Sequence, residues 1–184
     1  MYEPQEDSLM LKEVVEKFLF SNPKKVCVDM GAGSGIQGFA MEKFCERVIF
    51  SDVNLDVINY LRGKVKGKNN FLVVESDLFD NLNDFVGGCD LIVFNPPYLP
   101  RESEEVDDLE LTSGVSGIDI TCKFVIQSKK FLSREGRLFF VVSSLSDIDS
   151  LNETLKSEGF KFEIAKSDHF FFEDIMIYEA WLDA

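Results

Sequence analysis

The sequence predicts an α/β fold in which a seven-stranded, mostly parallel sheet carries helices on both faces and ends in an antiparallel C-terminal hairpin. Three observations support this prediction. Short apolar runs bounded by turn residues alternate with stretches of helical periodicity, as in repeated βα units. Most of these runs are continuously apolar, which is typical of strands buried on both faces. The last two runs follow one another with only a short connection, which indicates a hairpin.

The first helix is expected to begin at Asp7 or Ser8. Either side chain can accept a hydrogen bond from a free N–H group in the first turn. Apolar residues then recur at the spacing i, i+3, i+4 and i+7, which places them on one face of a helix. They are Leu11, Val14, Val15 and Phe18.

Strands and helices are expected to alternate along the rest of the chain. The strands are predicted at Val26–Met30, Val48–Ser51, Phe71–Glu75, Leu91–Phe94 and Arg137–Val142, and the helices at Ile36–Phe44, Leu55–Lys64 and Asp119–Leu132. Ser146 and Asp149 resemble a capping box at the start of a further helix, which Gly159 ends. The strands Phe160–Ala165 and Ile175–Trp181 complete the sheet as an antiparallel pair.

The length of 184 residues fits a single domain, residues 1–184. A chain of this size can bury roughly 70% of its unfolded surface without disulfides. Its four cysteines (Cys27, Cys45, Cys89, Cys122) show no C-x-x-C spacing and are expected to be reduced thiols. His169 is the sole histidine and has no cysteine nearby, so no metal site is expected. Without a signal peptide or a bilayer-spanning apolar stretch, a cytoplasmic protein is expected, and a nuclear pool is compatible with the same features.

The composition also bears on the partners of this protein. Its formal net charge is −14. Nucleic-acid binders rely on Lys and Arg to displace phosphate counterions, whereas the one Lys-rich turn here, Lys64–Lys68, is more typical of a solvated loop. Direct binding to nucleic acid or to a membrane is therefore not expected. A basic protein suits this charge better as partner or substrate.

A glycine-rich segment, Asp29–Gly35, ends the first predicted strand and opens a helix. Its glycines (Gly31, Gly33, Gly35) permit a tight turn and the close approach of a ligand. In an open α/β sheet, ligands bind at this edge, beyond the carboxyl ends of the strands. The second strand ends at Asp52, which is placed to bind ribose hydroxyl groups, and the third is followed by Asp77 and Leu78, which can hold an adenine amine and ring.

Three carboxylates, those of Asp29, Asp52 and Asp77, thus close three successive strands. They suit a cationic ligand better than a pyrophosphate. A nicotinamide dinucleotide site is the alternative, because the segment Gly33–Gly38 satisfies the pattern G-x-G-x-x-G and Asp52 follows it. That alternative places a carboxylate beside two phosphates and leaves the next motif unexplained.

The most informative motif is Asn95-Pro96-Pro97-Tyr98, directly after the apolar run Leu91–Phe94. The two prolines fix φ and hold Asn95 extended. They have no N–H group, so the backbone there offers only carbonyl acceptors. An amide oxygen, a carbonyl and an aromatic face together suit a planar group that carries an –NH2. An ordinary proline-rich turn is the alternative interpretation.

An acidic segment without a predicted helix or strand follows the motif, from Leu99 to Gly117. A solvated loop is one interpretation of it. A loop of this length beside a site is more often a lid or a substrate-binding segment, which is what we expect here.

With these residues in place, the chain resembles the class I S-adenosylmethionine-dependent methyltransferases, which have a Rossmann-like fold. Their glycine-rich first loop looks like Asp29–Gly35, and their ribose-binding acid matches Asp52. In that family, an N-P-P-Y tetrad after the fourth strand marks the members that methylate planar nitrogens. The opening Tyr2-Glu3-Pro4-Gln5-Glu6-Asp7-Ser8 is similar to the Y-x-P-x-E-D-[ST] start of the HemK-type protein glutamine methyltransferases, in their short eukaryotic and archaeal form.

The resemblance implies N5-methylation of a glutamine side chain, that of the Gly-Gly-Gln loop of the class 1 peptide release factor, with S-adenosyl-L-methionine as the cofactor. It also implies a heterodimer with a small zinc-binding activator subunit. The residues that it places in the cofactor pocket are Ser8, Asp29, Gly31, Gly33, Gly35, Asp52, Asp77, Leu78 and Asn95. The catalytic residues that it implies are Asn95, Pro96 and Tyr98, and Pro97 joins them in the substrate-binding site.

Two other functions are compatible with the same residues. One is N-methylation of the exocyclic amine of adenine or cytosine in DNA or RNA, and the other is a nucleotide-binding scaffold without catalysis.

The predicted third strand is a candidate site for binding the partner subunit. In the family's sheet order it lies at an edge, and its run Phe71–Val74 has no charge or proline to protect that edge from another chain.

Overall fold

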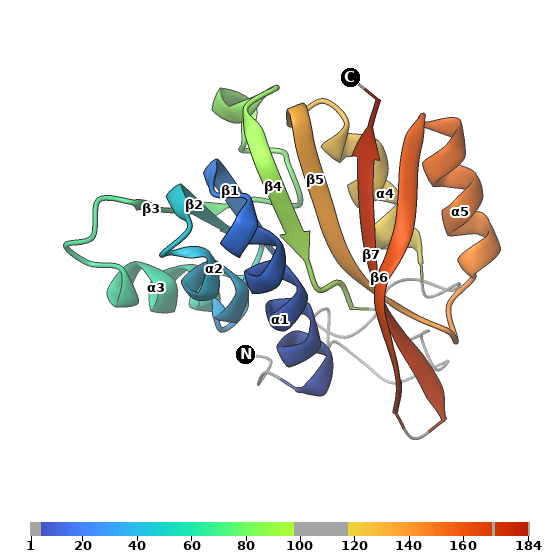
Figure 1. Ribbon diagram of the computed structural model, residues 1–184. Coiled ribbons are helices and arrows are strands. Elements are labelled where there is room, and N and C mark those ends of the chain that lie inside the picture. Colours follow the sequence, from blue (N-terminus) through green and yellow to red (C-terminus); the bar gives the residue numbers. More distant parts are fainter. Residues whose placement is uncertain (1–4, 98–117, 171, 184) are drawn as a thin grey trace.

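The computed structural model describes residues 5–97, 118–170 and 172–183. Its centre is one seven-stranded sheet with the strand order β3-β2-β1-β4-β5-β7-β6 (Figure 1). The strands are β1 (Lys24–Met30), β2 (Cys45–Asp52), β3 (Phe71–Glu75), β4 (Cys89–Phe94), β5 (Leu132–Ser143), β6 (Phe160–Phe170) and β7 (Glu173–Leu182). The first five pair in parallel, and β7 lies antiparallel between β5 and β6. The predicted fold class is confirmed, including the position of β3 at an edge.

Helices cover both faces of the sheet (Figure 1). Helices α1 (Glu6–Ser21), α2 (Ile36–Met41) and α3 (Leu55–Lys64) bury their apolar side chains on one face, in a cluster with Phe50 and Phe139. Helices α4 (Asp119–Ser128) and α5 (Ile148–Ser157), with the 3-10 helix η1 (Asn83–Phe85), pack on the other face. The central strands β1 and β4 are therefore buried on both sides, which explains why their sequences read as continuous apolar runs.

The starts of two helices differ from the prediction. Helix α1 begins at Glu6 after Gln5, and neither Asp7 nor Ser8 caps it. Both lie inside the first turn and are buried, because they make contacts with a distant part of the chain that are described below. Helix α5 is capped by Asp147, which accepts a hydrogen bond from the Ser150 N–H at 3.1 Å, so the predicted capping box is wrong.

Several element ends also differ. The helices predicted to reach Phe44 and Leu132 end at Met41 and Ser128, and β2 and β5 begin soon afterwards. Apolar residues in those short connections fit a helix as well as a strand by pattern alone. The end predicted for α5 is confirmed, since Gly159 follows it with φ +84° and its N–H donates to the Lys156 carbonyl at 3.0 Å. The hairpin strands β6 and β7 are longer than predicted, because polar residues near the turn interrupt the apolar pattern.

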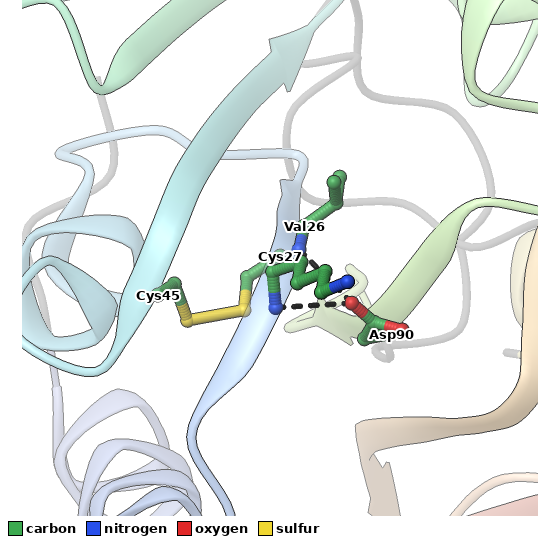
Figure 2. The surroundings of a disulfide bond; sticks show 5 residues. Val26, Cys27, Cys45 and Asp90 are labelled. Carbon is green, nitrogen blue, oxygen red and sulfur yellow. Dashed lines mark hydrogen bonds between the residues drawn. A yellow bond between two sulfur atoms is a disulfide. The ribbon is translucent and has the colours of Figure 1, made fainter.

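The expectation of four reduced cysteines is wrong for two of them. Cys27 on β1 and Cys45 at the start of β2 form a disulfide between these neighbouring parallel strands (Figure 2). The spacing of 18 residues carries no recognisable disulfide signal, and only the pairing of the strands brings the two side chains together. On the other side of β1, the Asp90 carboxylate accepts hydrogen bonds from the N–H groups of Lys25 and Val26 at 3.0 and 3.1 Å. Cys89 and Cys122 are free thiols.

Within the described ranges, no helix is both long and apolar enough to cross a membrane. The predicted lid segment, residues 99–117, lies outside the described residues, as does Tyr98.

Candidate active site

The site is built at the edge of the sheet where four parallel strands end. Because β3, β2, β1 and β4 are adjacent and parallel, the segments after them meet along one edge (Figure 1). Met30, the last residue of β1, pairs with Phe94, the last residue of β4, so the glycine loop and Asn95 leave the sheet side by side. The strand order reverses direction between β1 and β4, which is where open α/β sheets form their ligand crevice.

The glycine loop depends on left-handed backbone conformations. Gly31, Gly33 and Gly35 have φ angles of +58°, +50° and +79°, which side chains other than glycine rarely adopt. A Cβ atom on Gly31 would also lie 3.0 Å from Cε2 of Phe94, and one on Gly35 would lie 2.8 Å from Cδ2 of Leu61. The loop therefore passes close to the end of β4.

Asp52 supports this loop from the neighbouring strand. One of its carboxylate oxygens accepts a hydrogen bond from the Gly33 N–H at 2.9 Å, and the other accepts from the Asn54 N–H at 2.9 Å. The side chain is 9% exposed, and a carboxylate has acceptor capacity beyond two bonds. Asp52 can thus hold the loop in place and still receive the hydroxyl groups of a ribose.

Asp29 lies on β1 just before the loop and is 2% exposed. Its carboxylate accepts a hydrogen bond from the Gly38 N–H at 2.8 Å. Burial raises the pKa of Asp29 well above its usual value; the Gly38 hydrogen bond opposes this rise, and the charge of Asp52 adds to it. The structure therefore brings Asp29 and Asp52 close enough to interact, whereas Asp77 is exposed after β3.

Leu78 has an unusual backbone. It is the one non-glycine residue with a positive φ in the described part of the chain, at 45°. Such a conformation is strained and persists only where the surroundings impose it, which is common at binding sites. Here the Leu78 carbonyl accepts a hydrogen bond from the Ser51 hydroxyl at 3.3 Å, and the side chain is 8% exposed. Leu78, which follows β3 in the chain, is thus held beside the end of β2.

Asn95 is held by residues of α1, 87 and 88 positions away. Its amide nitrogen, Nδ2, donates to Oδ2 of Asp7 and to Oγ of Ser8, both at 3.0 Å. Its amide oxygen, Oδ1, is buried and has no hydrogen-bond partner among the residues that the structure describes. Pro96 is buried and Pro97 is half-buried. The site therefore contains an amide acceptor at the end of β4, beside the glycine loop.

Sequence reasoning missed two residues of this network. The sequence pattern predicts Asp7 only as a helix cap, although it belongs to the E-D-[ST] opening. Gln37 on α2 was not predicted at all. Its side-chain N–H group donates to the Ser8 carbonyl at 2.8 Å, and its Oε1 is buried without a hydrogen-bond partner among the described residues. Gln37 and Asn95 together tie the start of α1 to α2 and to the end of β4.

Comparison with known proteins identifies the family. The family model described as "Methyltransferase small domain" matches residues 8–171. The chain belongs to the methyltransferase small domain family. A Methanocaldococcus jannaschii protein that is named as a protein N5-glutamine methyltransferase is 32% identical over 98% of this chain and 91% of its own length. The eRF1 methyltransferase catalytic subunit mtq2 of Schizosaccharomyces pombe is 26% identical over 87% of this chain and 80% of its own length.

Solved structures have the same fold. One of them is the Mtq2–Trm112 complex of E. cuniculi, which is responsible for methylation of the eRF1 translation termination factor. A chain of that complex superposes with a TM-score of 0.78 at 23% identity, and the superposition covers 99% of this chain and 98% of that one. TYW2 of M. jannaschii, in complex with AdoMet, superposes with a TM-score of 0.65 at 16% identity, covering 97% of this chain and 77% of that one. These findings confirm, at the level of the family, that the chain is a methyltransferase of class I fold with HemK-type relatives. The nicotinamide alternative is not supported.

The roles predicted for individual residues stay predictions, but the residues present fit the cofactor. The glycine loop, the Asp52 carboxylate and the strained Leu78 line the edge where a nucleoside would lie. The buried Asn95 oxygen faces no protein donor in the described chain. No cluster of three metal-ligating side chains occurs among the described residues.

Proposed function

We propose that this chain methylates the side-chain amide nitrogen of a glutamine, that of the Gly-Gly-Gln loop of the class 1 peptide release factor, and that it does so as the catalytic subunit of a cytoplasmic heterodimer. S-adenosyl-L-methionine supplies the methyl group when it is bound. The observation that carries the proposal is the buried Oδ1 atom of Asn95, which has no hydrogen-bond partner among the described residues and lies at the carboxyl end of β4, beside the glycine loop.

The chemistry required of the protein is positioning. An amide nitrogen is a weak nucleophile because its lone pair is delocalised into the carbonyl group. Asn95 Oδ1 and the Pro96 carbonyl can each accept one N–H bond of the acceptor, which orients the nitrogen and favours the pyramidal geometry of attack. Tyr98 is proposed to pack on the plane of the amide. Holding both reactants in this geometry can contribute on the order of 7 kcal/mol to lowering the barrier.

A protein amide is a better substrate for this chain than a nucleobase. Asn95 and Pro96 would accept the exocyclic amine of adenine or cytosine equally well. The net charge of −14, however, opposes the phosphate contacts on which nucleic-acid binding depends. Curated relatives named as glutamine and eRF1 methyltransferases support the same choice.

The proposed partner binds at the edge strand β3. In the described sheet, β3 pairs only with β2, so its outer N–H and C=O groups face away from the sheet. Leu72 is 38% exposed on this strand, and Val73 and Val74 are half-buried. A small zinc-binding subunit can add a strand there and cover the apolar side chains. The partner subunit in the Mtq2–Trm112 complex supports this assembly.

Radiolabelled methyl transfer tests the function. The chain, with and without its partner subunit, is incubated with labelled S-adenosylmethionine and a cell extract, and the labelled residue is mapped by mass spectrometry. We expect the label on the Gly-Gly-Gln glutamine, and none on a release factor in which glutamate replaces that glutamine, because the two acceptors would then face a carboxylate. Methylation of naked DNA or RNA at physiological salt, with none of the release factor, would contradict the proposal. Calorimetry that detects no cofactor binding, even with the partner, would favour a scaffold.

A further inference from the structure

We infer that Asp7 is a positioning residue for methyl transfer, because it selects the orientation of the Asn95 amide that presents Oδ1 to the acceptor. This inference rests on the proposed function of Asn95. It concerns the choice between two orientations of one side chain, which differ by a rotation of about 180° about the last side-chain bond. In one orientation the acceptor atom faces the substrate, and in the other the amide N–H group does.

The chemistry of the three groups shows why Asp7 makes this choice. An ionised carboxylate only accepts hydrogen bonds, so the group of Asn95 that faces it has to be the –NH2. Nδ2 of Asn95 lies 3.0 Å from Oδ2 of Asp7, which is a normal distance for such a bond. The reverse orientation would place the Asn95 oxygen against a carboxylate oxygen, with no proton between them. Asp7 therefore favours one orientation and penalises the other.

Ser8 cannot make the same choice, although it lies at the same distance. A hydroxyl group both donates and accepts, and its hydrogen rotates to suit its neighbour. Oγ of Ser8 can therefore accept from the Asn95 –NH2 at 3.0 Å or donate to the Asn95 oxygen in the reverse orientation. Of the two groups of α1 that contact Asn95, only the carboxylate distinguishes its two faces.

The Asp7 carboxylate is itself held in place. It is 4% exposed, and its second oxygen, Oδ1, accepts a hydrogen bond from the Ser8 N–H at 2.6 Å. The same turn is anchored through the Ser8 carbonyl, to which Gln37 donates at 2.8 Å. Helix α1 then packs on the sheet through Leu11 and Val15, both fully buried. The orientation of Asn95 is thus set by a rigid element and not by a mobile side chain.

The local sequence complements this contact. Pro96 and Pro97 restrict the backbone after Asn95 and so fix the direction in which Asn95 leaves β4. They do not distinguish the two ends of its amide group, since neither has an N–H group to donate. The prolines therefore fix where the amide lies, and Asp7 fixes which end of it faces the acceptor. The acceptor nitrogen needs both conditions to meet an oxygen.

The substitution Asp7→Asn tests the inference with almost no change in shape. The new amide both donates and accepts, so it can pair with either end of the Asn95 amide and the selection is lost. We expect kcat to fall about 10- to 100-fold, in line with the cost of a misplaced reacting group. The Kd of S-adenosylmethionine should change less than about threefold, since the substitution leaves the loop and the strand ends intact. The matched control is Glu6→Gln, which removes an exposed carboxylate from the same helical turn without contacting Asn95; its kcat should equal that of the wild type.

A second measurement does not depend on activity or on the variant. In the wild-type chain, NMR of the Asn95 side-chain –NH2 should show slow hydrogen exchange and a single orientation, because both contacts to α1 hold it. Exchange as fast as that of an exposed asparagine would overturn the inference, as would an Asp7→Asn enzyme with more than half the wild-type kcat. A wild-type chain that methylates no glutamine, with or without a partner, would instead refute the proposed function. If Asp7→Asn does not fold, the wild-type NMR result decides.

Discussion

Two helical glycines that lie in opposite environments provide a sharp test of the packing. Gly38 on α2 faces the ring of Phe50, which is fully buried and packs against Phe39 and Phe71 with ring centroids 5.1 and 5.4 Å away. A Cβ atom on Gly38 would lie 2.6 Å from Cζ and 2.7 Å from Cδ1 of that ring, and closer still to Cε1. Gly63 on α3 is exposed, and nothing lies within 4 Å of its Cβ position.

The expected effects of alanine at these positions have opposite signs. Overpacking a core lowers the free energy of unfolding by about 1–3 kcal/mol, and the better helix propensity of alanine offsets up to about 1 kcal/mol of this loss. Gly38→Ala should therefore lower the free energy of unfolding by about 2 kcal/mol, which for a chain of this length lowers Tm by roughly 4–8 °C. Gly63→Ala receives the propensity gain alone, so it should raise the free energy of unfolding by about 0.5–1 kcal/mol.

Urea and thermal unfolding, followed by circular dichroism, measure both variants against the wild type. Gly38→Ala should also loosen the N–H group that holds Asp29, so its affinity for S-adenosylmethionine should fall with its stability. The ring of Phe50 cannot move aside without disturbing two neighbouring rings. A Gly38→Ala chain as stable as the wild type, measured beside a stabilised Gly63→Ala chain, would therefore refute this account of the contact between α2 and β2.

Three further predictions follow from the site, the partner edge and the buried acid. Asn95→Ala should lower kcat on the order of 100- to 1000-fold while the chain stays folded, since it removes an acceptor aimed at the reacting nitrogen; Tm should fall as well, because the hydrogen bonds to Asp7 and Ser8 are lost. Steady-state methylation measures the effect on kcat, and more than half the wild-type kcat would contradict it. Leu72→Lys should weaken partner binding in calorimetry while the chain keeps its Tm, because Leu72 is exposed on β3; unchanged affinity would move the interface elsewhere. Asp29→Asn should raise the free energy of unfolding at pH 8, because the raised pKa of Asp29 means that burial destabilises its charged form. The gain should shrink as the pH falls and the wild-type Asp29 becomes protonated, and a gain independent of pH would contradict this.

The positions of the central strands and the glycine loop are predictable because their causes are local, whereas the place of β3 at an edge is expected from the resemblance to the family. Continuous apolar runs indicate buried parallel strands, and the strand run Phe71–Glu75 and the helix Leu55–Lys64 match the structure at both ends. The strand lies between Asn70 and Ser76, and the helix starts directly after Asn54, so at these ends the apolar pattern stops where the element does. Elsewhere the pattern does not stop. Phe44 and Leu132 are apolar residues beyond the ends of α2 and α4, and nothing in the nearby sequence tells whether such a residue closes a helix or leads into a strand.

Contacts between distant residues account for the rest of what the sequence did not reveal. The disulfide joins residues 18 positions apart that only the pairing of β1 and β2 brings together. Phe71 was expected to serve with its neighbours as an exposed edge, yet it is 9% exposed and stacks on Phe50, so Leu72 is the residue that probes the edge. Strand alternation explains the difference, since successive side chains of β3 point to opposite faces and only one of these faces carries α2 and α3.

Both the local sequence and a contact with a distant residue determine the geometry of Asn95. Its place at the end of a buried strand, and its extended backbone before two prolines, follow from the residues on either side of it. The orientation of its amide follows from a carboxylate 88 residues earlier, and no pattern in a strand or a turn carries that information. A planar acceptor site requires the oxygen and not the nitrogen to face the substrate, so chemistry depends on the distant contact as much as on the local motif. This gives a physical reason why Asp7 and Asn95 should act as one unit. The local motif alone would place the amide but leave it free to rotate, and Asp7 alone could not place the amide at the end of β4.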